Sequence, residues 1–168
     1  MSSTDTRTHA HTSTLQKAAR AVGVVFLLVG IAGFIPGLTS DYDRMQGAGH
    51  ESMALLLGIF MVSWLHNLVH LLFGVAGLVA SRRWSSSRAF LIGGGAVYLV
   101  LWVYGMVVDQ NSSANFVPVN SADNWLHLVL GLGMIALGVL LSRTTRSAVE
   151  AGHDDAVPST RGAGHGSV

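Results

Sequence analysis

The chain has 168 residues, a length that fits a single domain. Half of the residues are hydrophobic and only 11% are charged, whereas soluble domains carry about 25% charged residues. This shortfall of charge indicates that lipid covers much of the molecular surface. The net charge of +1 predicts no nucleic-acid partner, and the lack of cysteine excludes thiolate catalysis, disulfides and iron–sulfur clusters.

Four uncharged runs predict four transmembrane helices. Each run has the roughly 20 apolar residues that a helix needs to cross a hydrocarbon core about 30 Å thick. Helices are expected because lipid offers no partners for free backbone groups, and because the runs lack the alternation of β-barrel strands. In chain order the runs are Ala21–Ser40, Ser52–Ser81, Ala89–Val108 and Asn124–Ser142. We therefore predict an all-α fold, an integral membrane four-helix bundle formed by residues 15–143.

Lys and Arg predict the orientation of these spans, because cytoplasmic loops carry an excess of both residues. All of them except Arg44 lie before the first span, between the second and third spans, or after the fourth. Both chain ends are therefore expected in the cytoplasm. The two tails, residues 1–14 and 144–168, are rich in Ser, Thr, Gly and His without apolar periodicity, so we expect them to be disordered.

A motif shared by the second and fourth spans predicts an internal duplication. The pattern Asn-x-x-His-Leu-x-x-Gly occurs at residues 67–74 and again at residues 124–131. A weaker echo relates residues 26–33 of the first span to residues 98–105 of the third. Since both predicted hairpins begin and end on the cytoplasmic side, we expect two parallel repeats related by a pseudo-twofold axis along the membrane normal.

Polar side chains inside the second and fourth spans form the candidate site. An unpaired polar group in hydrocarbon costs several kcal/mol, so we expect these side chains to face the protein interior. If the two helices face each other, the groups meet in the outer half of the bundle. We call them the polar cluster: His66, Asn67, His70, Asp123, Asn124 and His127.

The sequence leaves three roles open for the polar cluster. In the first, hydrogen bonds between helices lock the hairpins together, and the protein is a non-catalytic accessory or structural component. In the second, a membrane redox subunit holds haem or a transition metal through His66, His70 and His127, with Asp123 as a further metal ligand or as a group that orients one. In the third, the titratable groups conduct protons or a small solute.

We expect the first role, with no catalytic residue and no bound cofactor. The spacing of His66 and His70 is by itself a weak metal motif, and Asn67 has no established ligand role. The inner halves of the spans carry no charged residue, so a continuous proton relay is not visible. The expected partners are the lipid bilayer and either another membrane protein or a second copy of the chain.

Three motifs resemble those of a known protein family. They are residues 33–37 (Gly-Phe-Ile-Pro-Gly), residues 66–71 and residues 118–128. Between about Lys17 and Arg143 the chain is similar to a four-helix bacterial membrane family that is common in high-GC Gram-positive bacteria and is catalogued as a domain of unknown function. The resemblance implies a multi-pass protein of the bacterial plasma membrane and no particular activity. A looser likeness to DoxX-type proteins, some of which are linked to redox systems, favours the cofactor alternative.

Overall fold

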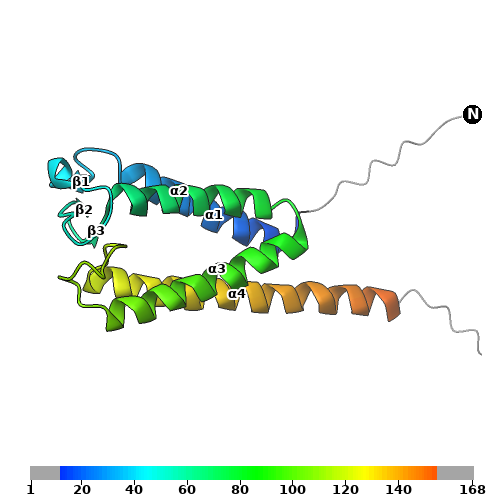
Figure 1. The fold of residues 1–168 in the computed structure, drawn as a ribbon. Helices are drawn as coiled ribbons and strands as arrows, with labels where there is room; N and C mark the ends of the chain where they lie inside the picture. The colour runs from blue at the N-terminus through cyan, green and yellow to red at the C-terminus, as the bar shows by residue number, and fades with distance from the viewer. Residues whose placement is uncertain (1–11, 155–168) are drawn as a thin grey trace, which may run out of the picture.

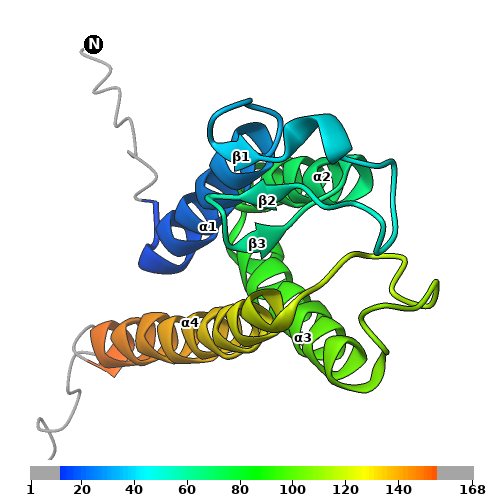
Figure 2. The same cartoon turned by 90° about the vertical axis from the view of Figure 1, so that its left-hand side faces the viewer.

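The computed structural model describes the backbone of residues 12–154 and the side chains of residues 12–143. Its helices are α1 (Thr14–Ala32), α2 (Trp64–Ala80), α3 (Trp84–Val107) and α4 (Ser121–Asp154). Helix α1 packs along α2, and α3 packs along α4, so that the chain forms two helical hairpins (Figure 1). Seen along the helices, one hairpin lies above the other (Figure 2). The predicted set of four helices is confirmed.

A small antiparallel sheet lies in the connection between α1 and α2. Its strands, adjacent in chain order, are β1 (Thr39–Ser40), β2 (Leu55–Leu56) and β3 (Phe60–Met61), and the short 3-10 helix η1 (Tyr42–Arg44) follows β1. Thr39 pairs with Leu56, which in turn pairs with Phe60. The sheet covers one end of the bundle, which we call the sheet end (Figures 1 and 2). The opposite end, where a short loop joins α2 to α3, is the loop end.

The predicted first span, Ala21–Ser40, is wrong at its C-terminal boundary, because α1 ends at Ala32. The backbone N–H of Gly33 closes the helix on the carbonyl of Val29, at 3.0 Å. The hydroxyl of Thr39 then donates to the carbonyls of Ala32 and Gly33, both at 3.3 Å, and so satisfies groups that a longer helix would have bonded internally.

The predicted second span, Ser52–Ser81, is also too long, because residues 52–63 are not helical and α2 begins at Trp64. The turn between β2 and β3 has positive φ angles at Leu57 (53°) and Gly58 (71°), which a right-handed helix does not contain. The Ser63 hydroxyl caps α2 by accepting the His66 N–H at 3.1 Å. Backbone geometry, and not hydropathy, therefore sets where α2 starts.

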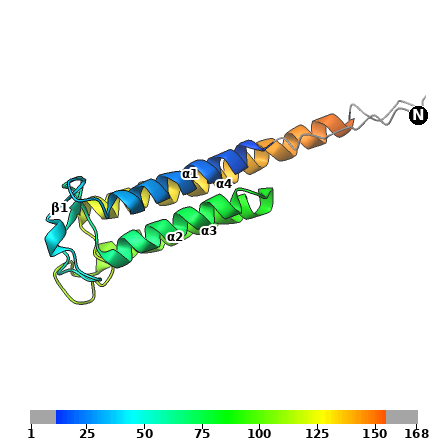
Figure 3. The ribbon, with the colours of Figure 1, turned by 90° about the horizontal axis from the view of Figure 1, so that it is seen from above.

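Helix α4 is longer than predicted. It continues to Asp154, through residues 144–154 of the tail that we expected to be disordered, and its end extends past the other helices (Figure 3). This stretch has no proline, and its first glycine is Gly152, so nothing in its backbone chemistry stops the helix earlier. The N-terminal tail that we expected to be disordered, residues 1–14, is also shorter than predicted, because Ser13 caps α1 and Thr14 is its first residue. The rest of the tail predictions concern residues 1–11 and 155–168, which lie outside the described residues.

Within the part of the chain that the structure describes, three helices are long and apolar enough to cross a membrane: α1, α3 and residues 121–143 of α4. Helix α2 is apolar but has only 17 residues, or about 25 Å at 1.5 Å per residue. Large apolar side chains are exposed on the helices, for example Val100 (68%) and Leu132 (55%). Length, composition and exposed apolar surface together are those of a membrane protein.

Aromatic rings fill the space between the two hairpins. Phe26 of α1 stacks on Tyr98 of α3, with ring centroids 5.4 Å apart, and Phe73 of α2 meets both rings edge-on. Each of the stacked rings also contacts a histidine of its own hairpin: Phe26 lies 5.8 Å from His70, and Tyr98 lies 5.3 Å from His127. A ring–histidine contact therefore occurs in each hairpin at positions that the sequence echo matches, stacked in the first hairpin and edge-on in the second.

Glycines bring the paired backbones into direct contact. A Cβ atom added at Gly23 would lie 2.9 Å from the carbonyl oxygen of Gly74, and one added at Gly95 would lie 2.7 Å from that of Gly131. Real Cβ atoms do not approach backbone oxygens so closely, so neither hairpin has room for a methyl group there. These two contacts are again equivalent between the hairpins.

The adjacent glycines of α3 provide a test of this packing. Gly95→Ala should destabilise the protein by about 1–3 kcal/mol, because α3 and α4 must separate to admit the methyl group. Gly93→Ala, whose Cβ would meet nothing within 4 Å, should be neutral or stabilising by up to about 1 kcal/mol, because alanine is the better helix former. Thermal unfolding in detergent measures both, and equal melting temperatures for the two variants would contradict the packing described.

Candidate functional site

Four of the six residues of the polar cluster line one cavity at the sheet end. The cavity has a volume of about 100 Å³. Its polar lining consists of His66 and His70 from α2, and Asp123 and His127 from α4. Its apolar lining comes from α1, from the loop and strands of the sheet, and from α4: Val29, Leu56, Leu57, Phe60, Val62, Leu126 and Leu130. The predicted meeting of α2 and α4 side chains thus holds for these four polar residues.

The two histidines of α2 are held in one tautomer by backbone carbonyls. His66 Nδ1 lies 3.3 Å from the carbonyl oxygen of Pro118, and His70 Nδ1 lies 3.1 Å from that of His66. A carbonyl oxygen only accepts, so each Nδ1 carries the proton and donates it. In the neutral rings Nε2 is then the atom with a free lone pair. The rings stack with centroids 4.7 Å apart and planes at 22°.

His127 has a nitrogen without a partner. Its ring packs edge-on against Tyr98, and its exposed fraction is 4%. Nδ1 is buried, and no hydrogen bond to it occurs among the described residues. A buried polar atom in this state costs free energy, because it has lost water and gained nothing in exchange.

Asp123 joins the start of α4 to the sheet. Its Oδ2 accepts the backbone N–H of Asn120 at 3.0 Å and that of Met61 in β3 at 3.1 Å. Asn120 returns the first contact, because its Oδ1 accepts the Asp123 N–H at 3.0 Å. This reciprocal pair is a capping box, in which each side chain satisfies an otherwise free N–H of the first helical turn. The bond to Met61 is different in kind, since it crosses from the second hairpin to the first.

The two asparagines of the polar cluster lie apart from the cavity, each within its own hairpin. Asn124 Nδ2 donates to the carbonyl of Gly105 at 2.8 Å, and Asn67 Nδ2 contacts the sulfur of Met45 at 3.8 Å. Asn67 also lies against Gly33, as Asn124 lies against Gly105, so tightly that a Cβ at either glycine would overlap the amide. The structure therefore divides the predicted cluster into a four-residue cavity lining and two Asn–Gly contacts.

The arrangement of the cavity-lining side chains and the volume of the cavity do not favour a metal ion or a haem at this site. Among the described residues, no group of three or more His, Asp or Glu side chains is arranged to hold a metal ion. The cavity at His66, His70, Asp123 and His127 is also small, because sites for drug-sized ligands measure about 300–1,000 Å³. As it stands, the arrangement suits a molecule of a few heavy atoms.

Sequence reasoning missed the partners that the sheet supplies. Met61 and Ile59 lie in a stretch that we predicted to be helical, and Pro118 contributes only its backbone carbonyl to the site. Asn120 carried a usable signal, since an Asn three residues before an Asp at a helix start is close to the capping-box pattern. The Leu57-Gly58 turn carried less, because only its glycine marks a turn.

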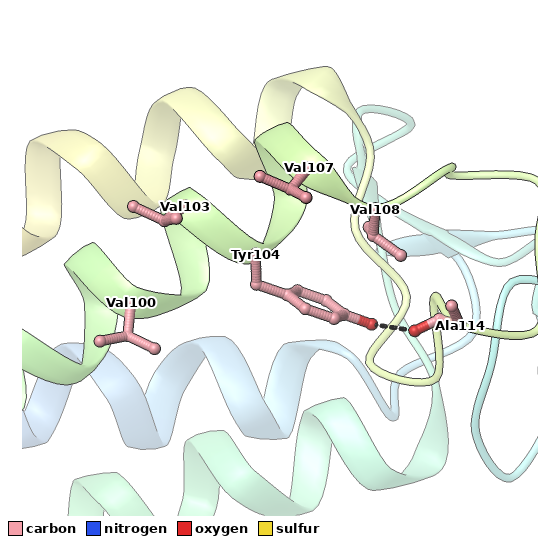
Figure 4. Close-up of a pocket in the computed structure, with 6 residues that line it drawn as sticks. All are labelled: Val100, Val103, Tyr104, Val107, Val108 and Ala114. Carbon is pink, nitrogen blue, oxygen red and sulfur yellow. Dashed lines mark hydrogen bonds between the residues drawn. The ribbon is translucent and has the colours of Figure 1, made fainter.

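A second hollow is an open, apolar groove on the outer side of α3 (Figure 4). Its volume is about 540 Å³, and it is lined by Val100, Val103, Tyr104, Val107, Val108 and Ala114. The Tyr104 hydroxyl donates to the Ala114 carbonyl at 2.6 Å and ties the following loop back to the helix. The groove offers apolar contact and no free polar side chain, so it has no chemistry of its own.

Fold and site define a class of protein: a small bundle of two helical hairpins whose apolar helices are those of a membrane protein. Within this class the chain belongs to the family described as Domain of unknown function (DUF4383), whose model matches residues 16–140. The predicted resemblance to an uncharacterised family is confirmed. Comparison with curated proteins and with solved structures gave no match.

The carboxylate of Asp123 should be what holds the sheet against α4. Asp123→Ala leaves the amides of Met61 and Asn120 without their acceptor, and a hydrogen bond to a charged group contributes about 1.5–3 kcal/mol. Hydrogen exchange at the Met61 amide should therefore accelerate by about tenfold or more. Asp109→Ala is the control, because Asp109 accepts the Asn111 N–H at 3.0 Å in an exposed loop. If Met61 exchanges at the same rate in both variants, Asp123 does not fasten the sheet.

Proposed function

We propose that the protein is a multi-pass component of the bacterial plasma membrane without catalysis of its own, and that part of its polar cluster fastens the two hairpins together at the sheet end. The observation that carries this is a set of three side-chain hydrogen bonds between the halves of the chain. Asp123 accepts the Met61 N–H at 3.1 Å, and His66 Nδ1 donates to the Pro118 carbonyl at 3.3 Å. Asn120 Nδ2 donates to the Ile59 carbonyl at 2.8 Å.

Membrane insertion with both termini in the cytoplasm is supported by charge. Lys and Arg of the described residues gather at the loop end and at the adjoining helix ends: Lys17, Arg20, Arg82, Arg83, Arg88 and Arg143. At the sheet end Arg44 stands among acidic residues. By the positive-inside rule the loop end faces the cytoplasm.

Tryptophans support the same placement. Trp64 (50% exposed) opens α2 and Trp125 (65% exposed) lies in the first turns of α4, both at the sheet end. Trp84 (38% exposed) opens α3 at the loop end. Exposed tryptophans at both ends of a helical bundle are typical of the two membrane–water interfaces. The short α2 is then completed at its outer end by the sheet.

The equivalent contacts of the two hairpins support a parallel repeat. Gly23 with Gly74 and Gly95 with Gly131 bring the helices together in the same way. The ring contacts Phe26–His70 and Tyr98–His127 follow the same correspondence. With both hairpins running from the loop end to the sheet end and back, the repeat axis lies along the helices.

The redox and conduction alternatives have less support. A redox centre needs ligands that converge on one point and room for the cofactor, and the cavity is small for a haem. A conductor needs polar groups that continue towards the loop end. Instead, the next buried side chains beyond His70 and His127 are Phe26, Tyr98 and Met134, which form one packed cluster. The buried serines Ser81, Ser87 and Ser142 lie beyond that cluster, near the loop end.

Orientation can be tested on single-cysteine variants, because the natural chain has no cysteine and each introduced thiol is unique. Ser40 and Ser85 are both exposed, the first in β1 at the sheet end and the second in the first turn of α3 at the loop end. In intact cells, a membrane-impermeant maleimide should label Ser40→Cys and leave Ser85→Cys unlabelled until the cells are permeabilised. The opposite labelling pattern would invert the proposed orientation.

The absence of a redox cofactor is tested by an absorption spectrum and elemental analysis of protein purified from its native membrane in mild detergent. We expect no Soret band and less than one tenth of a metal ion per chain, roughly the level of contamination. The control is the triple variant His66→Leu, His70→Leu and His127→Leu. A Soret band or about one metal per chain that disappears in this variant would establish the redox alternative.

A further inference from the structure

The connection between α1 and α2 divides into a charged part and an uncharged part. Residues 52–63, which contain β2, β3 and the turn between them, carry no charge. The turn itself, residues 57–59 (Leu-Gly-Ile), is exposed, with 62% of Leu57 and 53% of Ile59 accessible. We call it the apolar turn. The charged part lies earlier in the chain and has four exposed charged side chains: Asp41, Asp43, Arg44 and Glu51.

The apolar turn lies beside the helices at the sheet end. Leu57 lines the same cavity as Val29, in the last turn of α1, and Leu126, in the second turn of α4. Strands β2 and β3 lie across the space between the hairpins (Figure 2). The exposed Trp125 precedes Leu126, and the exposed Trp64 follows β3 after two residues. Because exposed tryptophans favour the membrane–water interface, the apolar turn lies at the depth of the outer interface.

The backbone of the apolar turn does not need water as a partner. Its three N–H groups donate to the carbonyls of Leu38, Leu55 and Leu56, at 2.7, 3.2 and 3.1 Å. The carbonyl of Ile59 accepts Asn120 Nδ2 at 2.8 Å. A free N–H group carried into an apolar environment costs free energy, and this cost normally keeps irregular backbone out of lipid. The N–H groups of the apolar turn incur no such cost.

The residue type at Leu57 is unusual for a turn that faces water. Leu57 and Gly58 have φ angles of 53° and 71°, and the N–H of Ile59 donates to the carbonyl of Leu56. Tight turns with two positive φ angles are usually formed by Asn-Gly or Asp-Gly, because short polar side chains tolerate the left-handed region. A leucine there gives up this conformational advantage and adds apolar surface at the tip of the turn.

We propose that the apolar turn inserts into the outer leaflet of the bilayer and anchors the sheet there. The proposal rests on the membrane insertion proposed above. Leu57 and Ile59 contact the lipid at the boundary between headgroups and acyl chains, a zone into which apolar faces of interfacial segments insert by about 5–10 Å. The charged part of the connection stays in water. The sheet is then held on one side by its hydrogen bonds to the second hairpin and on the other by lipid.

Fluorescence quenching in lipid nanodiscs tests the insertion on the purified full-length protein. The fluorophore NBD is attached to Leu57→Cys or to Ile59→Cys, and to Ser40→Cys, an exposed position of β1, as the matched control. A lipid with a nitroxide near the top of its acyl chain should quench the probes at residues 57 and 59. Aqueous iodide should quench these two probes at least about fivefold less than the probe at residue 40.

Two outcomes overturn the proposal. One is that the nitroxide lipid quenches neither turn probe, and the other is that iodide quenches both as strongly as the probe at residue 40. Both are expected if the apolar turn faces water or is the contact surface of a partner protein. Leu132→Cys, at a 55% exposed position midway along the apolar part of α4, reports membrane insertion separately. Lipid quenching at residue 132 without lipid quenching at the turn refutes the anchor alone, whereas iodide quenching at all four positions also refutes membrane insertion.

A substitution at Leu57 tests whether its side chain supplies the anchor. Leu57→Asn suits the left-handed φ better than leucine, so the melting temperature in detergent should stay at or above that of the wild type. With NBD at Ile59→Cys, Leu57→Asn should raise iodide quenching by about threefold or more, because the apolar contact with lipid is lost. Leu57→Met, which keeps an apolar side chain, should leave the quenching unchanged. A folded Leu57→Asn protein with unchanged quenching overturns the assignment of the anchor to Leu57.

Discussion

The structure depends on the direct approach of two helix backbones within each hairpin. Gly23 with Gly74, and Gly95 with Gly131, allow a separation at which a methyl group no longer fits. In lipid the hydrophobic effect does not draw apolar helices together, so close packing of this kind is a main source of association. With the helices this near, the side chains on either side of the contact have fixed neighbours. Phe26 and Tyr98 lie in the space between the hairpins, and each contacts a histidine of its own hairpin.

The sheet end solves a different problem, which is how to join two hairpins that are each already packed. The aromatic cluster supplies apolar contact between them, and Phe26, Tyr98 and Met134 form its buried part. At the sheet end the joining groups are polar, and their partners are backbone atoms of the opposite half. In the proposed function these bonds also set the register of the hairpins, because a backbone partner is fixed in position by the fold around it. The same arrangement leaves a small cavity between the histidines and the sheet.

The sequence predicted the four helices from their apolar runs, although not all of their boundaries. It predicted a repeat from Asn and His residues, which are rare in lipid. Asn67 and Asn124 were visible as matched positions, and they make matched contacts with Gly33 and Gly105. The sheet could not be predicted in the same way. Hydropathy reflects how apolar a residue is and carries no information about its φ angle. The apolar turn at Leu57 was therefore predicted to be the beginning of a transmembrane span. The division of the polar cluster was hidden for a related reason, since the partners are backbone groups of residues that carry no motif.

The sheet is attached to only one of the two hairpins. Residues 33–63 connect α1 to α2, whereas residues 108–120 connect α3 to α4 without a described strand. Two hairpins that pack alike thus differ outside their helices: the first bears the sheet at the sheet end (Figure 2), and the second bears the open apolar groove along α3 (Figure 4). A neighbour that contacts the sheet end meets strands on the first hairpin and a loop without a described strand on the second, so it distinguishes the two hairpins although their helices pack alike.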